Sequence, residues 1–213
     1  MRVLPACVLL LIGSGAGCRT AADEAGPPIL QPGAPGEGSR VISTAEAVDL
    51  SGVRHTAADV RFMQGMIGHH AQALEMVALL RSRTNREDMR LFARRIELSQ
   101  EDEISLMQRW LQMRGARVPD AHAHHAAGAT LMPGMLTPDE MGRLEAATGK
   151  EFDRLFLESM VKHHEGALVM VSELFASPGA AQESDIFSFA TDIDADQRIE
   201  IARMGAMLRE LQQ

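Results

Sequence analysis

The chain contains an internal repeat, which limits the folds open to it more than any other feature of the sequence. The stretch FMQGMIGHHAQALEMV at 62–77 aligns without gaps to FLESMVKHHEGALVMV at 156–171. A second match follows each copy, because the pattern AxxIxxxQxxEIxxM begins at Ala93 and again at Ala190. The chain therefore contains one structural unit that occurs twice.

Each copy of this unit is predicted to be a helical hairpin. The matched residues of the second pattern step by three or four positions, as on one face of a helix, and no strand-like alternation appears. A further helix start is predicted at Thr137-Pro138-Asp139-Glu140, which has a cap residue, an early proline and a glutamate in the first turn. Two tandem hairpins predict an all-α fold, an antiparallel four-helix bundle of ferritin-like architecture with an approximate twofold axis.

The first 18 residues have the pattern of an export signal, with one arginine, a short apolar run and then small residues. The stretch Gly15-Ala16-Gly17-Cys18 resembles a lipobox, in which Cys18 becomes lipidated and anchors the protein to a membrane. Ordinary cleavage near Ala21-Ala22 is the alternative. Both interpretations predict an exported protein, either periplasmic or a membrane-anchored lipoprotein.

The remainder of the chain is expected to divide into two parts. Residues 19–55 are rich in Pro and Gly, and we expect them to form a flexible tether. Residues 56–213 are expected to form the bundle from two repeats, 56–113 and 138–213. A loop rich in His and Met, 114–137, joins these repeats.

The composition argues against several functions. The chain has 29 acidic and 21 basic residues and no basic run, so nucleic acid is not an expected partner. No phosphate-binding loop, zinc-protease motif or nucleophile with its base is present, which argues against hydrolysis and phosphoryl transfer. Because Cys7 and Cys18 both belong to the signal region, a metal site in the mature domain must use His, Met, Asp or Glu.

The two HisHis motifs supply the first candidate metal ligands. Adjacent helical residues point about 100° apart, so only one histidine of each pair needs to face the interior. Each histidine pair shares its helix with methionines at helical spacing, which places imidazole beside thioether. The alternative is ordinary core packing, since methionine stripes and hydrogen-bonded histidines are common in cores. These candidate ligands are Met66, His69, His70, Met76, Met160, His163, His164 and Met170.

The loop between the repeats supplies a second group of candidate ligands. Imidazole suits copper and zinc, and closely spaced thioethers select Cu(I). The alternatives are a solvated linker that is rich in histidine, or a methionine plug packed over the end of the bundle. The candidates are His122, His124, His125, Met132 and Met135.

These motifs together resemble those of DUF305, a bacterial family of unknown function that includes copper-binding members. The resemblance covers about residues 55 to 211 and rests on the two HisHis stretches, the second repeat pattern and MPGMLTPDEM at 132–141. It implies a ferritin-like bundle and an exported role in binding copper or silver. The same resemblance carries that role over to Met66, His69, His70, Met76, Met160, His163, His164 and Met170.

Three functions remain open on the sequence alone. The first is a buffer or chaperone for copper(I) or silver, with zinc as an alternative ion, in which the HisHis motifs form an interior site. The second is a ferritin-like metal-dependent oxidase, and the third is a structural or interaction bundle without metal. The sequence does not decide whether the chain has enzymatic activity or whether it forms a homodimer.

Matched polar residues on the second helix of each hairpin bear on the oxidase hypothesis. Di-iron bundles need several carboxylates with Glu-x-x-His spacing, and no glutamate stands three residues before any histidine of the two motifs. We therefore expect these polar residues to orient ligand histidines or to satisfy core ones. They are Gln100, Glu103, Gln197 and Glu200.

Overall fold

The computed structural model describes residues 27–31, 38–49, 52–126 and 128–212, and it forms two units, one up to residue 50 and one from residue 51. In the first unit, β1 (Ile29–Gln31) pairs antiparallel with β2 (Arg40–Ile42), and α1 (Thr44–Val48) follows. The segment expected to be a tether thus contains three short elements. Strand pairing and helix-cap hydrogen bonds hold them locally, since α1 has no buried residue.

The expected export signal and its Cys18 lie outside the described residues. In the part of the chain that is described, no helix has both the length and the apolar character that crossing a bilayer requires.

Four long helices form the second unit: α2 (Ala57–Arg83), α3 (Glu87–Met113), α5 (Gly149–Ala176) and α6 (Ser184–Leu211). A capping box between Thr56 and Asp59 begins α2. The second carboxylate oxygen of Asp59 accepts a hydrogen bond of 2.7 Å from the backbone N–H of Ala181. The start of α2 is thereby fixed to the turn between α5 and α6.

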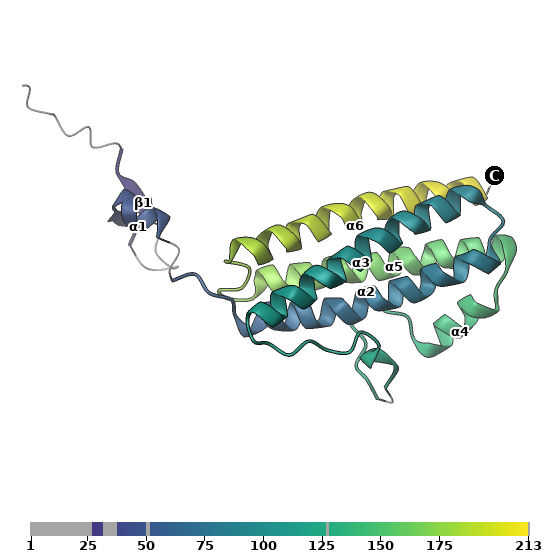
Figure 1. Cartoon of the computed structure of the whole chain (residues 1–213). Coiled ribbons are helices and arrows are strands. Elements are labelled where there is room, and N and C mark those ends of the chain that lie inside the picture. Colours follow the sequence, from purple (N-terminus) through teal and green to yellow (C-terminus); the bar gives the residue numbers. More distant parts are fainter. Residues whose placement is uncertain (1–26, 32–37, 50–51, 127, 213) are drawn as a thin grey trace, which may run out of the picture. The chain divides into compact units, whose positions relative to one another are not determined.

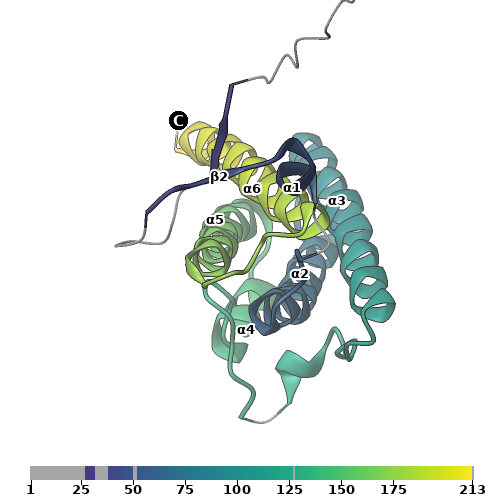
Figure 2. The ribbon, with the colours of Figure 1, turned by 90° about the vertical axis from the view of Figure 1, so that its left-hand side faces the viewer.

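The four helices pack in the cyclic order α2, α3, α6, α5, with each helix antiparallel to its neighbours (Figures 1 and 2). An ion pair joins the start of α3 to the end of α6, where Arg86 lies 3.4 Å from Glu210. Another joins the end of α3 to the start of α6, where Arg114 lies 3.4 Å from Asp185. The fold is all-α, and the predicted antiparallel four-helix bundle is confirmed. One hairpin is α2 with α3, and the other is α5 with α6.

The helix start predicted at Pro138 is present, but it belongs to a separate short helix. Thr137 and Glu140 form the capping box of α4 (Pro138–Ala146). The backbone of Ala147 and Thr148 is then extended, so the long helix of the second hairpin begins only at Gly149. Together with the short 3₁₀ helix η1 (Ala123–His125), α4 lies on one side of the bundle, next to α2 (Figures 1 and 2).

The bundle core consists of two hydrophobic clusters with polar side chains between them. One cluster contains Met66 and Met170, and the other contains Met76 and Met160. Each of the four long helices carries two polar residues that lie, along the helix, between its residues of one cluster and its residues of the other. We call these positions the central polar layer, which comprises His69, His70, Gln100, Glu103, His163, His164, Gln197 and Glu200.

Candidate metal centres

The four histidines of the central polar layer are all buried, with at most 1% of each residue exposed. Only one histidine of each pair was expected from the sequence to face the interior, whereas both do so. Each helix of the bundle has two neighbours, which explains the difference. His69 on α2 faces α5, and His70, about 100° further around the helix, faces α3.

The two hairpins place their histidines in matching positions. His70 Nε2 lies 2.5 Å from the Glu103 carboxylate, and His164 Nε2 lies 2.7 Å from the Glu200 carboxylate. Between the hairpins, the rings of His69 and His163 stack with centroids 3.8 Å apart and planes inclined by 36°. The layer therefore has the approximate twofold symmetry that the repeat predicts.

The hydrogen bonds determine which ring nitrogen of three histidines is protonated. An ionised carboxylate and a carbonyl oxygen only accept, so Nε2–H of His70 and of His164 donates to its glutamate. His69 Nε2–H likewise donates to the backbone carbonyl of Pro133 at 3.0 Å. In a neutral ring, Nδ1 then keeps its lone pair, and none of these Nδ1 atoms has a hydrogen-bond partner among the described residues.

Burial keeps the two stacked histidines uncharged. It is the main reason that the pKa of His69 falls from 6.5 to about 3, and the neighbouring His70 lowers that pKa further. Burial also holds the pKa of His163 well below 6.5, with His69 as the next cause. Burial by itself raises the pKa of Glu103, but the hydrogen bond and charge of His70 outweigh it, so this carboxyl's pKa is lowered. The layer is thus set for neutral imidazole at its centre.

The other predicted helix residues border these histidines. Gln100 and Gln197 are buried in the layer, and within the described chain both amide atoms of Gln100 and Oε1 of Gln197 have no hydrogen-bond partner. The four predicted methionine ligands lie in the hydrophobic clusters on either side of the layer, and all are buried. They are Met66, Met76, Met160 and Met170.

The second half of the loop packs along α2 and α5 rather than over the end of the bundle. Gln72 makes two hydrogen bonds to the backbone of Leu136, of 2.8 and 2.7 Å. Glycine at 166 permits the backbone to approach, because a Cβ there would lie 2.0 Å from the Pro133 carbonyl oxygen. Met135 is buried, and Met132 packs on the cluster that contains Met66. These two methionines therefore fill the flank of the core.

The first half of the loop gathers its three histidines around Glu75 of α2. One carboxylate oxygen of Glu75 lies 2.9 Å from His122 Nδ1, 2.8 Å from His125 Nε2 and 3.5 Å from His124 Nε2. Burial raises the pKa of Glu75, but the hydrogen bonds of His125 and His122 outweigh it, and the pKa is lowered. We call Glu75, His122, His124 and His125 the Glu75 cluster.

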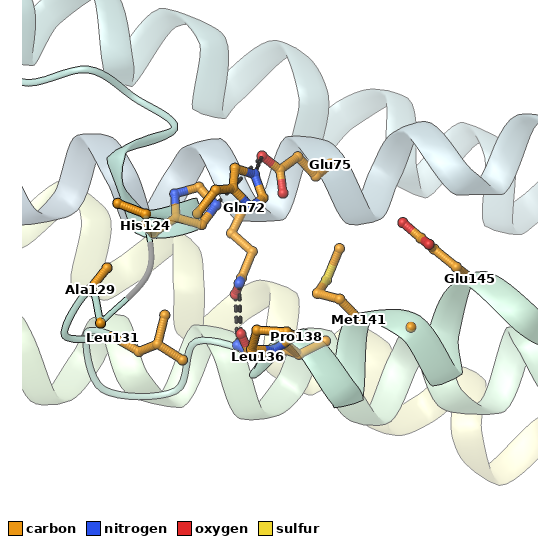
Figure 3. A pocket seen from close by; sticks show the side chains of 13 residues that line it. Gln72, Glu75, His124, Ala129, Leu131, Leu136, Pro138, Met141 and Glu145 are labelled. Atoms are coloured by element: carbon orange, nitrogen blue, oxygen red, sulfur yellow. Dashed lines mark hydrogen bonds and ion pairs between the residues drawn. The ribbon is translucent and has the colours of Figure 1, made fainter.

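Three members of the Glu75 cluster, Glu75, His124 and His125, form one wall of a pocket of about 690 Å³ between α2, the loop and α4. Figure 3 shows Glu75 and His124 on one side of this pocket and Met141 and Glu145 of α4 on the other. The pocket is open, so a bound ion would remain accessible to solvent and to small ligands.

The loop histidines were predicted from the sequence as candidate ligands, but Glu75 was not. The signal that would have found it is the divergence of the repeats, because Glu75 corresponds to Val169 and Gln72 corresponds to Gly166. Both differences occur where α2 or α5 meets the loop. The internal alignment emphasises what the two copies share, whereas the loop contacts depend on what they do not share.

A pseudo-symmetric four-helix bundle with matched histidines in its core defines the class of protein. The chain belongs to the family described as domain of unknown function DUF305, whose sequence profile matches residues 59–208. No functionally curated protein matches the chain.

Several solved structures of this family and of CopM are similar to the chain. A candidate secreted DUF305 protein from Streptomyces coelicolor is 29% identical with a TM-score of 0.62, over 72% of this chain and 93% of that one. A DUF305 fragment from Deinococcus radiodurans is 29% identical with a TM-score of 0.63, over 73% of this chain and 98% of that one. CopM in its Cu(I)-bound form is 25% identical with a TM-score of 0.57, over 71% of this chain and 96% of that one.

Proposed function

We propose that this chain is an exported protein that binds and buffers copper(I), or silver(I) in its place, through the central polar layer. One observation carries the proposal: the Nδ1 atoms of His69, His70 and His164 have no hydrogen-bond partner among the described residues, while each Nε2–H donates to an acceptor. Histidines that ligate metals have this arrangement, with the other ring N–H donated to a carboxylate or a carbonyl.

Copper(I) and silver(I) suit the ligands that surround the layer. Imidazole binds copper, and thioether sulfur selects the soft monovalent ion. Neutral histidine is the form that binds a metal, and the lowered pKa values of His69 and His163 keep both rings in that form. The thioethers of Met66, Met76, Met160 and Met170, in the hydrophobic clusters on either side of the layer, would supply the soft ligands. Similarity to CopM, whose structures include Cu(I)-bound and silver-bound forms, supports the same ions.

Buffering fits the layer better than oxidase chemistry does. A di-iron centre needs several carboxylates that are free to ligate. The two carboxylates of the layer, Glu103 and Glu200, each accept a hydrogen bond from a histidine. We therefore assign both glutamates to positioning histidines. The chain would act in the periplasm or, if Cys18 is lipidated, from the membrane surface.

The first test is a titration of the purified protein with Cu(I) against a competing chelator, compared with the variant His69→Asn/His163→Asn. We expect the double variant to bind Cu(I) at least about tenfold more weakly, because two buried imidazoles are removed. Silver(I) is expected to compete for the same site. Circular dichroism at rising temperature shows whether the variant remains folded.

The matched control is His55→Asn, since this histidine lies outside the central polar layer and packs on Trp110. It should bind Cu(I) as the wild type does. A folded double variant that retains the wild-type affinity would refute the proposal and leave a structural bundle whose histidines are core residues.

A further inference from the structure

The Glu75 cluster stands where the internal symmetry of the bundle is broken. Glu75 corresponds to Val169 in the second repeat, which is 45% exposed. The chain has one loop between its hairpins, and that loop covers α2 at Gln72 and Glu75. A carboxylate therefore occurs at this position only in the first repeat, where the three loop histidines contact it.

More imidazole nitrogens surround one oxygen of Glu75 than that oxygen can satisfy. A carboxylate oxygen has about two lone-pair sites. His122 Nδ1 and His125 Nε2 occupy them at 2.9 and 2.8 Å. His124 Nε2, at 3.5 Å, is too far for a good hydrogen bond and has no such partner in the described part of the chain.

The tautomer of a neutral His124 would make this arrangement unfavourable without a proton or a cation between the two side chains. Its Nδ1 lies 3.1 Å from the carbonyl oxygen of Ala121, which only accepts, so Nδ1 carries the hydrogen. In the neutral ring, Nε2 then directs a lone pair at the carboxylate oxygen of Glu75. The side chain of His124 is only 6% exposed, so water screens this repulsion poorly. A positive ion between the two atoms would turn the repulsion into two favourable contacts.

We propose that Glu75, His124 and His125 form a second metal site, which takes a divalent ion of intermediate softness, Zn²⁺ or Cu²⁺. Their ligand atoms all lie within 4.8 Å of one another. The backbone bond from His124 Nδ1–H to Ala121 is the kind of hydrogen bond that orients a metal-bound imidazole. His122, on the same carboxylate oxygen, is placed to join as a further ligand.

The ligand chemistry separates this site from the central polar layer. One carboxylate with two or three imidazoles suits Zn²⁺ and Cu²⁺, whereas Cu(I) prefers thioether and imidazole. The site also opens into the pocket between α2 and α4 (Figure 3), which would leave room for water or an exchanging ligand on the ion. This inference goes beyond the proposed function, because it concerns another site and another class of ion.

The test is calorimetric titration of the full chain with Zn²⁺ and with Cu²⁺, without reductant, for wild type and three variants. Glu75→Val installs the residue of the second repeat, Glu75→Gln keeps the shape of the side chain, and His124→Ala/His125→Ala removes two ligands. We expect each variant to bind both ions at least about tenfold more weakly. The electron paramagnetic resonance spectrum of bound Cu²⁺ should show nitrogen coupling that the double histidine variant loses.

Glu145→Gln is the matched control, since Glu145 lines the same pocket on α4 outside the Glu75 cluster, and it should bind Zn²⁺ as the wild type does. Wild-type affinity in Glu75→Gln, or a wild type that binds neither ion saturably because a proton fills the gap, would overturn the inference. Cu(I) titration of Glu75→Gln keeps the two proposals apart. Retained Cu(I) affinity leaves the central polar layer intact whatever the divalent ions do.

Discussion

The central polar layer and the Glu75 cluster use the same side chains in opposite surroundings. Both place imidazoles on glutamate carboxylates at hydrogen-bond distance. The layer lies on four long helices and is closed on both sides by hydrophobic clusters, whereas the Glu75 cluster joins one helix to a loop beside an open pocket. The two sites therefore contain the same residue types and differ in how deeply these residues are buried.

Burial has different consequences at the two sites. In the layer it removes water from His69 and His163, so protonating either ring costs folding free energy and both rings stay neutral. In the Glu75 cluster, the side chains of His122 and His125 are more than half exposed, and water screens their charges. We therefore expect the same residue types to determine stability at one site and, if the proposed ion binds, ligand exchange at the other.

Acid should have the largest effect, and it should act on the layer. The pKa of His69 is about 3 in the folded protein against 6.5 in the unfolded chain. The unfolded chain therefore binds a proton that the folded protein rejects, and stability is lost as the pH falls from 6.5 toward 3. The full loss from His69 is about 5 kcal/mol, of which about 2 kcal/mol is lost by pH 5. Urea unfolding of metal-free protein at pH 7.5 and pH 5 measures it.

The pH range of this comparison isolates the histidines. The lowered pKa values of Glu103 and Glu75 affect stability only below their ordinary value of 4.5. The variant His69→Asn should show a smaller difference between the two pH values. Equal free energies of unfolding for the wild type at pH 7.5 and pH 5 would mean that folding does not lower the pKa of His69.

The contact between the loop and α5 should rank below the full acid effect of about 5 kcal/mol, and Gly166→Ala tests it. The new Cβ would lie 2.0 Å from the Pro133 carbonyl oxygen and 2.6 Å from Gly134 Cα, and backbone atoms cannot move aside without displacing the loop. We expect a loss of about 3 kcal/mol in the free energy of unfolding, measured in urea.

Gly205→Ala is the control for this substitution. Gly205 lies within α6, and among the described residues a Cβ there meets only Arg209 Nη1, at 3.6 Å. This change should stabilise the protein by up to about 1 kcal/mol. If both alanine variants unfold at the same urea concentration, the loop is not held against α5.

The smallest effect should come from Glu75→Val in the absence of metal. Its ion pairs join a helix to partly exposed histidines, so we expect the free energy of unfolding to change by less than about 1 kcal/mol. Thermal melting with and without Zn²⁺ makes the contrast visible, because only the wild type should gain stability from the ion. A large loss without metal would show that the cluster is structural.

The repeat allowed most of the bundle to be predicted from the sequence. Helical spacing and duplication were enough for two hairpins and for the pairing of the two HisHis motifs. The burial of both histidines in each motif was not foreseen, because it depends on which two neighbours a helix has. That information belongs to the packing of four helices, not to any one helix.

The loop region resisted prediction for a different reason. The extended backbone at Ala147 and Thr148 separates α4 from α5, and no repeat partner exists to reveal it. The burial of Met135 and the role of Glu75 both depend on loop contacts, which join residues far apart in the sequence. A flexible-looking segment with small residues gives little local signal for such contacts.

The symmetry of the layer also has a consequence for how the chain folds. The bonds His70–Glu103 and His164–Glu200 each close within one hairpin, across 33 and 36 positions, whereas the stack of His69 on His163 joins the two hairpins. Contacts between residues close in sequence generally form before those between distant ones. We therefore expect each hairpin to form first, with its own His–Glu hydrogen bond, and the two hairpins to dock last. Any proton that His69 or His163 carries in the unfolded chain should then be released in this final step of folding.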